Sequence, residues 1–445
     1  MGDTQGPVQR LAGKAWRLAT EPLYRNAFLI MLSSVIGSGL GFFFWLAVGR
    51  FYATTDVGYA VALFQTLSFL AALAHLGMGT AIIRFLPETE EQAALVNTSA
   101  TVVGLGALLL AGVFLVGVTV FVPDLSFIQG NPVYPVVVLA ATLAIALTTI
   151  YDQASYAMRR ADVLTWRTFV TSVVKIPLAV GFAFVLLTQG RLGVFLALAL
   201  SFLVGVLLEA LVLLPRILRG FRPRPQLAFG HVRPMLRFSL GNYAANSIGA
   251  AGALLLPILI LNVAGRTAAA SVAYYYIGSI VAGLLNIIPS GVFTSFYAEA
   301  SQKNANRPVD ERRAILLSVG LLLPGIGVLW FFSQHMLTWF GNPAYASGAV
   351  GVLHVLIFGS IPAFLNTLLA TRIRVRKRSA PLIVGSAIST VVILGLGVLL
   401  LERYGIEGLA IAAVLGSAAA TPYYYAVARK SFREEAPPLE PTLTP

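Results

Sequence analysis

The chain has 445 residues, of which 58% are hydrophobic and 11% are charged, and it carries 31 Lys and Arg against 18 Asp and Glu. This composition excludes an ordinary soluble domain and predicts a polytopic membrane protein. The net charge of +13 does not indicate nucleic acid as a partner, because the basic residues fall in short gaps between apolar runs. The absence of cysteine excludes disulfides and cysteine-ligated metals.

Twelve apolar stretches follow a polar, basic segment, residues 1–25, which we expect to be an amphipathic helix on the membrane surface or a disordered tail. Each stretch is long enough to cross about 30 Å of hydrocarbon, so we expect an all-α membrane protein with twelve transmembrane helices. The stretches lie at 26–48, 57–82, 93–121, 133–157, 165–187, 192–214, 238–263, 270–298, 314–333, 345–370, 380–401 and 406–428.

The basic residues between these stretches predict the orientation. When the intervening segments are assigned alternately to two sides, 26 of the 31 Lys and Arg fall on the side of the amino terminus and four on the other, and Lys175 lies inside a stretch. Short loops rich in Lys and Arg remain in the cytoplasm. We therefore expect both termini to be cytoplasmic and the chain to lie in the inner membrane, in contact with its lipids.

A basic stretch, residues 215–237, divides the chain into two halves. It contains six arginines, four prolines and no carboxylate, so we expect a cytoplasmic hinge loop. Six stretches precede it, in a lobe over 26–214, and six follow it, in a lobe over 238–428, before an expected disordered tail at 429–445. Because six is even, the lobes run in the same sense, as parallel repeats do in several secondary transporters.

Three charged residues lie at least five residues from either end of the first lobe's stretches. Lys175 is about ten residues from either end of its stretch, and a charge at that depth costs roughly 2.5 to 3.5 kcal/mol unless it faces a partner or a wet cavity. If the turn between the fourth and fifth stretches is centred near residue 163, Asp152 lies at the same depth and is the natural partner. Glu209 is a second candidate. Lys175 is thus either half of a static ion pair or a cationic substrate site, and both carboxylates are candidates for ion coupling.

Four arginines, Arg25, Arg84, Arg167 and Arg237, lie at the cytoplasmic mouths of the stretches. Each one alone fits an orientation anchor. Together they fit a vestibule that collects phosphate, which guanidinium groups recognise well. In the second lobe, Asn242 and Asn246 are four residues apart and share a helix face, so they either line a polar path or hold helices together.

Several kinds of chemistry are missing from the sequence. No GxxxxGK[ST] motif is present, so transport must run on an ion gradient, on membrane potential or downhill. The four histidines lack metal-ligand spacing, and no catalytic constellation is visible. We therefore expect no cofactor, no metal and no enzymatic activity.

Diffuse patterns over the whole chain resemble a known family. They include RNAFLIMLSSVIGSGLGFFFWLAVGRFYATTDVGYA, YDQASYAMRRADVLTWRTFVTSVVKIPL, YYYIGSIVAGLLNIIPSGVFTSFYAEAS and WFGNPAYASGAVGVLHVLIFGSIP. The chain is similar to the polysaccharide-repeat-unit (Wzx-type) flippases of the multidrug/oligosaccharidyl-lipid/polysaccharide exporter superfamily. The resemblance implies two six-helix lobes around a cationic cavity that moves a polyprenyl-diphosphate-linked oligosaccharide between leaflets by alternating access. Arg84 and Lys175 match basic positions common in such sequences, and Glu299 matches an acidic one.

Two other functions stay open at this point. A cation-coupled multidrug antiporter would need a buried carboxylate, for which Asp152 and Glu209 are candidates. A membrane glycan polymerase or ligase would need a large outer loop, and the sequence contains none. The partners we expect are the lipid-linked oligosaccharide, H+ or Na+ as coupling ion, and polysaccharide assembly proteins.

Overall fold

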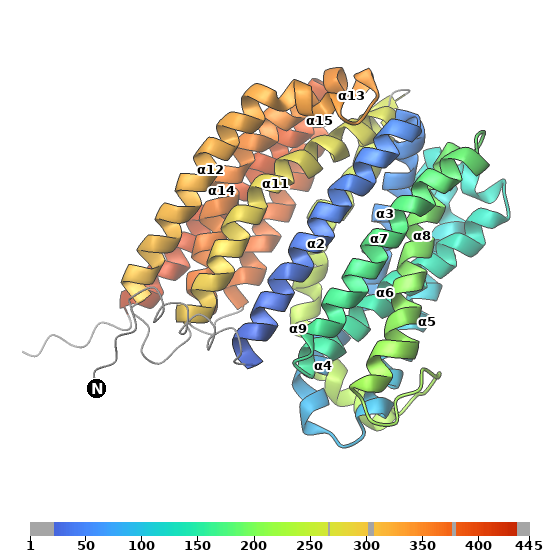
Figure 1. The fold of residues 1–445 in the computed structure, drawn as a ribbon, viewed down its shortest axis with the longest axis vertical. Helices are drawn as coiled ribbons and strands as arrows, with labels where there is room; N and C mark the ends of the chain where they lie inside the picture. The colour runs from blue at the N-terminus through green and yellow to red at the C-terminus, as the bar shows by residue number, and fades with distance from the viewer. Residues whose placement is uncertain (1–21, 266–267, 301–306, 376–379, 434–445) are drawn as a thin grey trace, which may run out of the picture.

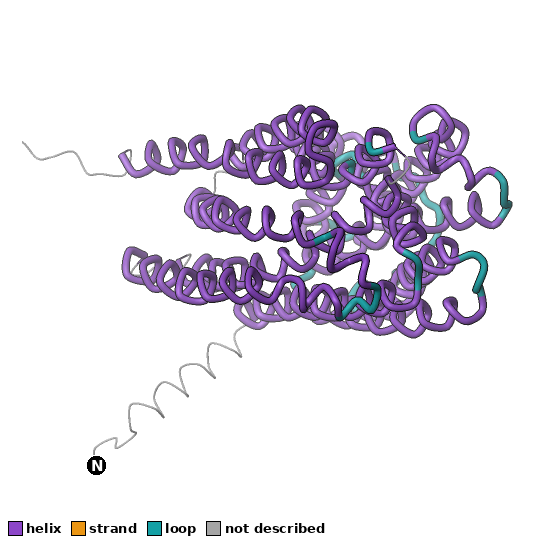
Figure 2. Tube along the Cα trace, turned by 90° about the horizontal axis from the view of Figure 1, so that it is seen from above, coloured by secondary structure: helices purple, strands orange, loops and turns teal. Residues whose placement is uncertain are grey.

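The computed structural model describes residues 22–265, 268–300, 307–375 and 380–433, and this part of the chain is almost entirely helical, without strands (Figures 1 and 2). The α-helices are α2 (Pro22–Phe51), α3 (Thr54–Ala74), α4 (Met78–Phe85), α5 (Gln92–Phe121), α6 (Val133–Ala157), α7 (Ala161–Val185), α8 (Gly190–Leu208), α9 (Phe229–Leu254), α10 (Leu256–Val263), α11 (Ala268–Ala300), α12 (Arg307–Thr338), α13 (Pro343–Gly348), α14 (Val350–Val375) and α15 (Ala380–Arg433). Short 3-10 turns cover Leu86–Glu88, Pro123–Gln129 and Leu214–Arg216, and a π-helical turn covers Glu209–Leu213.

Within the described residues, ten helices are long and apolar enough to cross a membrane. Their outward faces are as apolar as their buried ones: Leu109, Val116 and Val120 on α5 expose 67%, 82% and 80% of their surface. In water such a face would be a large exposed apolar patch, which is unfavourable, whereas among lipid acyl chains it is favourable. The chain is therefore a multi-pass membrane protein, as its composition predicts.

The last of the ten, α15, consists of two antiparallel arms. Gly405 breaks its 54 residues with φ 60° and ψ −150°, a conformation that glycine adopts without steric cost. The chain then folds back on itself, so that the Tyr424 hydroxyl donates to the Leu382 carbonyl oxygen over 3.0 Å. The expected stretches 380–401 and 406–428 both lie in this element, whereas α9 is not among the ten. The count of twelve crossings stays a prediction.

Several boundaries differ from those expected from the sequence, and two of them involve α9. The expected stretch 57–82 is broken into α3 and α4 by a turn in which Leu76 and Gly77 have φ 46° and 75°. A Cβ at Gly77 would lie 2.5 Å from the Cβ of Ser239, so α9 approaches the turn too closely for a side chain there. The expected hinge 215–237 is also shorter than predicted, since α9 begins at Phe229.

The helices form two groups, α2 to α8 and α9 to α15, with α2 running between them (Figure 1). We call the end of the bundle that holds Pro22 and Arg433 the terminal end, and the opposite end, which holds Thr54 and Ala268, the distal end. At the distal end α3 and α2 pack closely on α11. The two groups are in contact there and also where α9 packs on α3 and α4, so any space between them lies beside α2 and α11, toward the terminal end.

Candidate functional site

A cleft of about 390 Å³ lies between the two groups of helices. Ser34 and Ser38, four residues apart on α2, face it from one side, and Asn286 and Ser290 of α11 line it from the other. Hydroxyl and amide groups thus meet inside a bundle whose outer surface is apolar. This arrangement is typical of a binding site for a polar molecule, since polar groups in a bilayer are costly unless they meet water, ligand or one another.

Lys175 of α7 is not among the residues that line the cleft, but its ammonium lies against α2 just beyond Ser38. Its ammonium lies 5.4 Å from the centre of the Phe44 ring and 3.8 Å from the position that a Cβ on Gly41 would take. Gly41 is three residues beyond Ser38 on the same face of α2, so its missing side chain leaves room for the ammonium at the distal margin of the cleft. No described carboxylate lies within ion-pair distance of Lys175, whose charge faces α2 and the Phe44 ring.

Asp152 does not pair with Lys175, and this part of the expectation was wrong. Its partner is Arg167, whose guanidinium donates to both carboxylate oxygens, with the shortest distance 2.6 Å. The error lies in the position of the turn: α6 ends at Ala157 and α7 begins at Ala161, so the turn is centred near residue 159 instead of 163. At that centre Asp152 and Arg167 match in depth, and Lys175 lies about 12 Å deeper.

Glu209 joins the same pair from α8. Its carboxylate is completely buried, with one oxygen 3.8 Å from Nε of Arg167 and the other accepting from the Ser155 hydroxyl over 3.4 Å. Glu209 is also the first residue of the π-helical turn, a distortion that frequently marks functional sites. Three helices therefore bring two carboxylates and one guanidinium together, and we call Asp152, Arg167 and Glu209 the buried triad.

The buried triad is short of one positive charge when both carboxylates are ionised. One oxygen of Glu209 and the hydroxyl of Thr171 have no hydrogen-bond partner within the described residues. A buried net charge is costly, so binding of a proton or a small cation would relieve it. No group of three or more His, Asp or Glu that could hold a metal ion occurs in the described part of the chain.

None of the remaining expected site residues is seen to line the cleft. Arg84 of α4 is exposed and lies 3.6 Å from Glu88, and Arg167 is committed to carboxylates, so neither forms part of the cleft wall. The side chains of Arg25, Arg237, Asn242, Asn246 and Glu299 lie outside the described residues.

Sequence reasoning missed the residues that close the distal end. Tyr276 of α11 packs its ring against Trp45 of α2, with centroids 4.8 Å apart. Nearby, Gly58 of α3 touches α11 so closely that a Cβ would overlap the carbonyl oxygen of Ala269.

Residues 23–298 match the protein family described as "Polysaccharide biosynthesis protein", which is more than half of the chain. The chain belongs to this family. No curated protein sequence matches it. The family expected from the resemblance is thereby confirmed, and the sequence patterns that carried it lie largely inside the matched range.

Solved structures similar to this polysaccharide biosynthesis protein share its fold. The lipid II flippase MurJ in an inward closed conformation is 14% identical, covers 90% of this chain and 87% of its own, and gives a TM-score of 0.70. An inward-facing multidrug resistance transporter of the MATE family and MOP superfamily is 14% identical, with coverage of 91% and 98% and a TM-score of 0.66. A mutant of the Vibrio cholerae MATE transporter VcmN is 16% identical, with coverage of 93% and 97% and a TM-score of 0.57. The expected all-α, MATE-like fold is confirmed.

Proposed function

We propose that this protein is a flippase that moves a polyprenyl-diphosphate-linked oligosaccharide from the inner to the outer leaflet by alternating access. The observation that carries the proposal is the polar cleft between the lobes, in a chain of the polysaccharide biosynthesis family. Just beyond the cleft, against α2, lies Lys175, which has no carboxylate partner among the described residues. A sugar chain needs a polar path across the bilayer, whereas its lipid tail stays among acyl chains. The protein makes and breaks no bond in this process, so it is not an enzyme.

Lys175 is assigned the diphosphate, because its ammonium faces α2 and no described carboxylate neutralises it. Arg84 is exposed at the terminal end and is assigned the first contact with the headgroup, together with Arg25 and Arg237 at neighbouring mouths. Asn242, Asn246 and Glu299 are assigned the polar path in the second lobe, as their sequence positions suggest. The substrate thus passes from several exposed cations to one deep cation.

The buried triad is assigned the coupling of transport to an ion. Its excess carboxylate favours uptake of H+ or Na+, and it joins α6, α7 and α8, which must move together if the lobe rocks as one body. Arg167 then acts on its own carboxylates and not on substrate, which narrows the role expected from its position at a helix mouth.

The terminal end is assigned to the cytoplasm and the membrane to the inner membrane. The segments on that side carry 26 of the 31 Lys and Arg, and short basic loops resist translocation. A substrate built on the inner leaflet would then enter the cleft from its own side. Assembly proteins that elongate the exported glycan are expected to act at the distal end.

A second candidate, a cation-coupled multidrug antiporter, is favoured by one observation, the buried carboxylates of the triad. The two functions differ in cargo: a drug cation would be repelled by the unpaired Lys175, whereas a diphosphate would be attracted. The charge at the cleft margin therefore favours the flippase.

The test uses proteoliposomes that contain the purified protein and a fluorescent polyprenyl-diphosphate-linked oligosaccharide in both leaflets. Translocation is followed by the fraction that an impermeant reductant quenches over time. The proposal expects protein-dependent flipping and no proton-driven uptake of ethidium. Ethidium uptake without flipping would establish the antiporter instead, and neither activity would refute both.

A further inference from the structure

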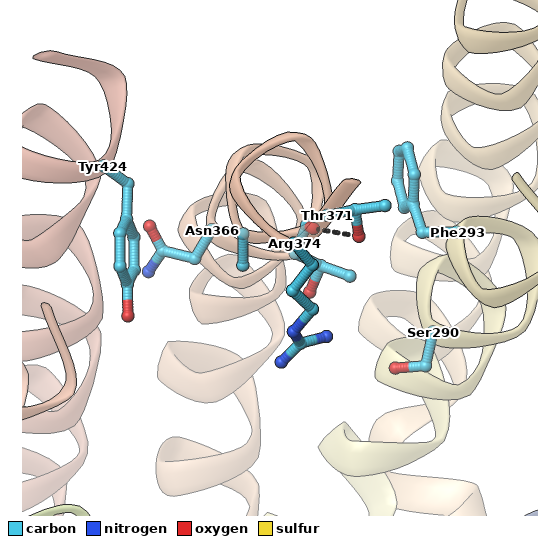
Figure 3. Close-up of a pocket in the computed structure, with 8 residues that line it drawn as sticks. Ser290, Phe293, Asn366, Thr371, Arg374 and Tyr424 are labelled. Atoms are coloured by element: carbon cyan, nitrogen blue, oxygen red, sulfur yellow. Dashed lines mark hydrogen bonds between the residues drawn. The ribbon is translucent and has the colours of Figure 1, made fainter. Parts of the chain in front are cut away.

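A second cavity, of about 530 Å³, lies inside the second group of helices, between α11, α14 and the second arm of α15 (Figure 3). Ser290 lines both this cavity and the cleft, so the two spaces adjoin. Figure 3 places Tyr424 on one side, Phe293 and Ser290 on the other, and Arg374 between them. We call this space the C-lobe pocket; it is distinct from the margin where Lys175 lies.

The wall of the pocket is held rigidly. The amide nitrogen of Asn366 donates to the carbonyl oxygen of Ser417 over 2.8 Å, and its amide oxygen accepts from the Thr421 hydroxyl over 2.8 Å, which ties α14 to α15. The hydroxyl of Tyr424 is held by the carbonyl of Leu382, and its ring presses on Gly385, where no Cβ could fit. A wall fixed in this way has little conformational entropy to lose when a ligand binds.

Arg374 is the one cation in the lining, and no described carboxylate is paired with it. Its neighbour Arg372, two residues earlier on α14, forms an ion pair with Glu311 of α12. The same helix end thus carries one arginine neutralised by a carboxylate and one whose guanidinium projects into a cavity. An arginine that served only as an orientation anchor would have no need of the aromatic and hydroxyl groups around it.

The lining defines what can bind. The hydroxyls of Thr371 and Tyr424 already donate to backbone carbonyls, so toward a ligand their oxygens act as acceptors for its hydroxyl groups. The guanidinium offers only donors, in a fork that matches an oxyanion. A ligand that satisfies both has ring hydroxyls next to an anionic group.

We propose that the C-lobe pocket binds a sugar ring bearing an oxyanion, through Arg374 and the hydroxyl oxygens of Thr371 and Tyr424. The anion is either the carboxylate of an acidic sugar or the phosphate next to the first sugar. This inference rests on the proposed flippase function and gives it a second anchoring point, in the lobe opposite Lys175. Binding there would hold the glycan away from the lipid-facing mouth of the cleft while the lobes move.

The test exploits the absence of cysteine from the natural chain. Ala370→Cys places one thiol in the lining, and its modification by anionic and cationic methanethiosulfonate reagents is timed for the full-length protein in lipid nanodiscs. We expect the anionic reagent to react at least about tenfold faster, and that preference to fall to near unity when Arg374→Gln is added. The matched control is Arg313→Gln on α12, which removes one exposed positive charge at the same end and should leave the preference unchanged.

Protection of the thiol identifies the ligand. Methyl glucuronide, methyl glucoside and farnesyl diphosphate are each added before the reagent, and melting temperature confirms that every variant is folded. Protection by the glucuronide that Arg374→Gln abolishes supports an acidic sugar; the same result with farnesyl diphosphate supports the phosphate. Equal protection by the glucoside in both backgrounds, no protection by any probe, or an equal loss of reagent preference in Arg313→Gln would overturn the proposal. The flipping assay is independent, so failure to flip a lipid-linked oligosaccharide would sink the proposed function and leave these labelling results standing.

Discussion

Arg167 and Arg374 are both arginines at the same end of the two lobes, yet they differ in burial and in ion pairing. Arg167 is buried between Asp152 and Glu209, with its shortest contact at 2.6 Å, whereas Arg374 is exposed in a cavity without a described carboxylate partner. A guanidinium that already satisfies two carboxylates has little left to offer a ligand, and an unpaired one has all of its donors available. Arg167 is therefore committed to the carboxylates of its own lobe, whereas Arg374 keeps its charge available to a ligand.

The largest expected effect comes from breaking the buried triad. Arg167→Ala leaves two carboxylates without a cation, and removing one partner of a buried ion pair costs about 3 to 5 kcal/mol. We expect a clear fall in melting temperature, measured by the loss of monodisperse protein on heating. The control is Arg160→Ala, whose partner Asp162 is also near the surface and whose loss should cost at most about 1 kcal/mol. Equal melting temperatures for the two variants would mean that the triad contributes nothing to the fold.

Lys175 tests whether an unpaired cation serves cargo. We expect Lys175→Ala to lower flipping about tenfold or more, because a charged hydrogen bond contributes roughly 1.5 to 3 kcal/mol, while the melting temperature hardly changes. Lys175→Arg should keep part of the activity. In cells the same variants are followed by surface glycan and by precursor accumulating on the inner leaflet. Normal export by a correctly inserted alanine variant would remove Lys175 from the mechanism.

The sequence predicts the helices better than it predicts the partners of the charges within them. Apolar length predicts most of the long helices to within a few residues, because a span must satisfy its own backbone in lipid. The partner of Asp152 depended instead on a turn whose Arg159 adopts φ 56°, a conformation that an arginine gives no reason to expect. Placing the centre of that turn four residues too late made Lys175, and not Arg167, the predicted partner of Asp152.

The cavities could not be predicted from the sequence either. Arg374 belongs to the basic run RIRVRKR, where nothing separates it from Arg372, and only the packing of α12 against α14 gives Arg372 the carboxylate of Glu311. Likewise Gly58 and Gly112 are both helical glycines, but a Cβ would collide with α11 at the first and meet open space at the second. Helix rotation and tertiary approach decide these differences, and neither is encoded in local pattern.

The same two glycines test whether contact between the lobes at the distal end keeps the cleft open. Gly58→Ala cannot be accommodated while α3 touches Ala269, and overpacking of this kind costs about 1 to 3 kcal/mol, or about 5- to 150-fold in a two-state equilibrium. We expect the population to shift toward a state with the distal end open and the cleft shut. A thiol introduced by Ser34→Cys in the cleft should then react correspondingly more slowly. Gly112→Ala is the matched control, and equal labelling rates in both backgrounds would mean that the distal contact does not set the cleft.

The smallest effect is expected at Arg84, which has a carboxylate partner, as Arg167 does, but is exposed, as Arg374 is. Its guanidinium lies 3.6 Å from Glu88, but both side chains are more than half exposed, so water screens the pair and leaves the charge available to a headgroup. Arg84→Gln should therefore lower flipping by no more than about threefold, through weaker capture of substrate, and the loss should disappear in high salt, where steering by surface charge is screened. Glu88→Gln is the matched control and should leave the rate unchanged or raise it slightly. A tenfold loss that persists in high salt would instead place Arg84 in direct, desolvated contact with the diphosphate. In that case, whether an arginine has a carboxylate partner would not predict whether it binds the substrate.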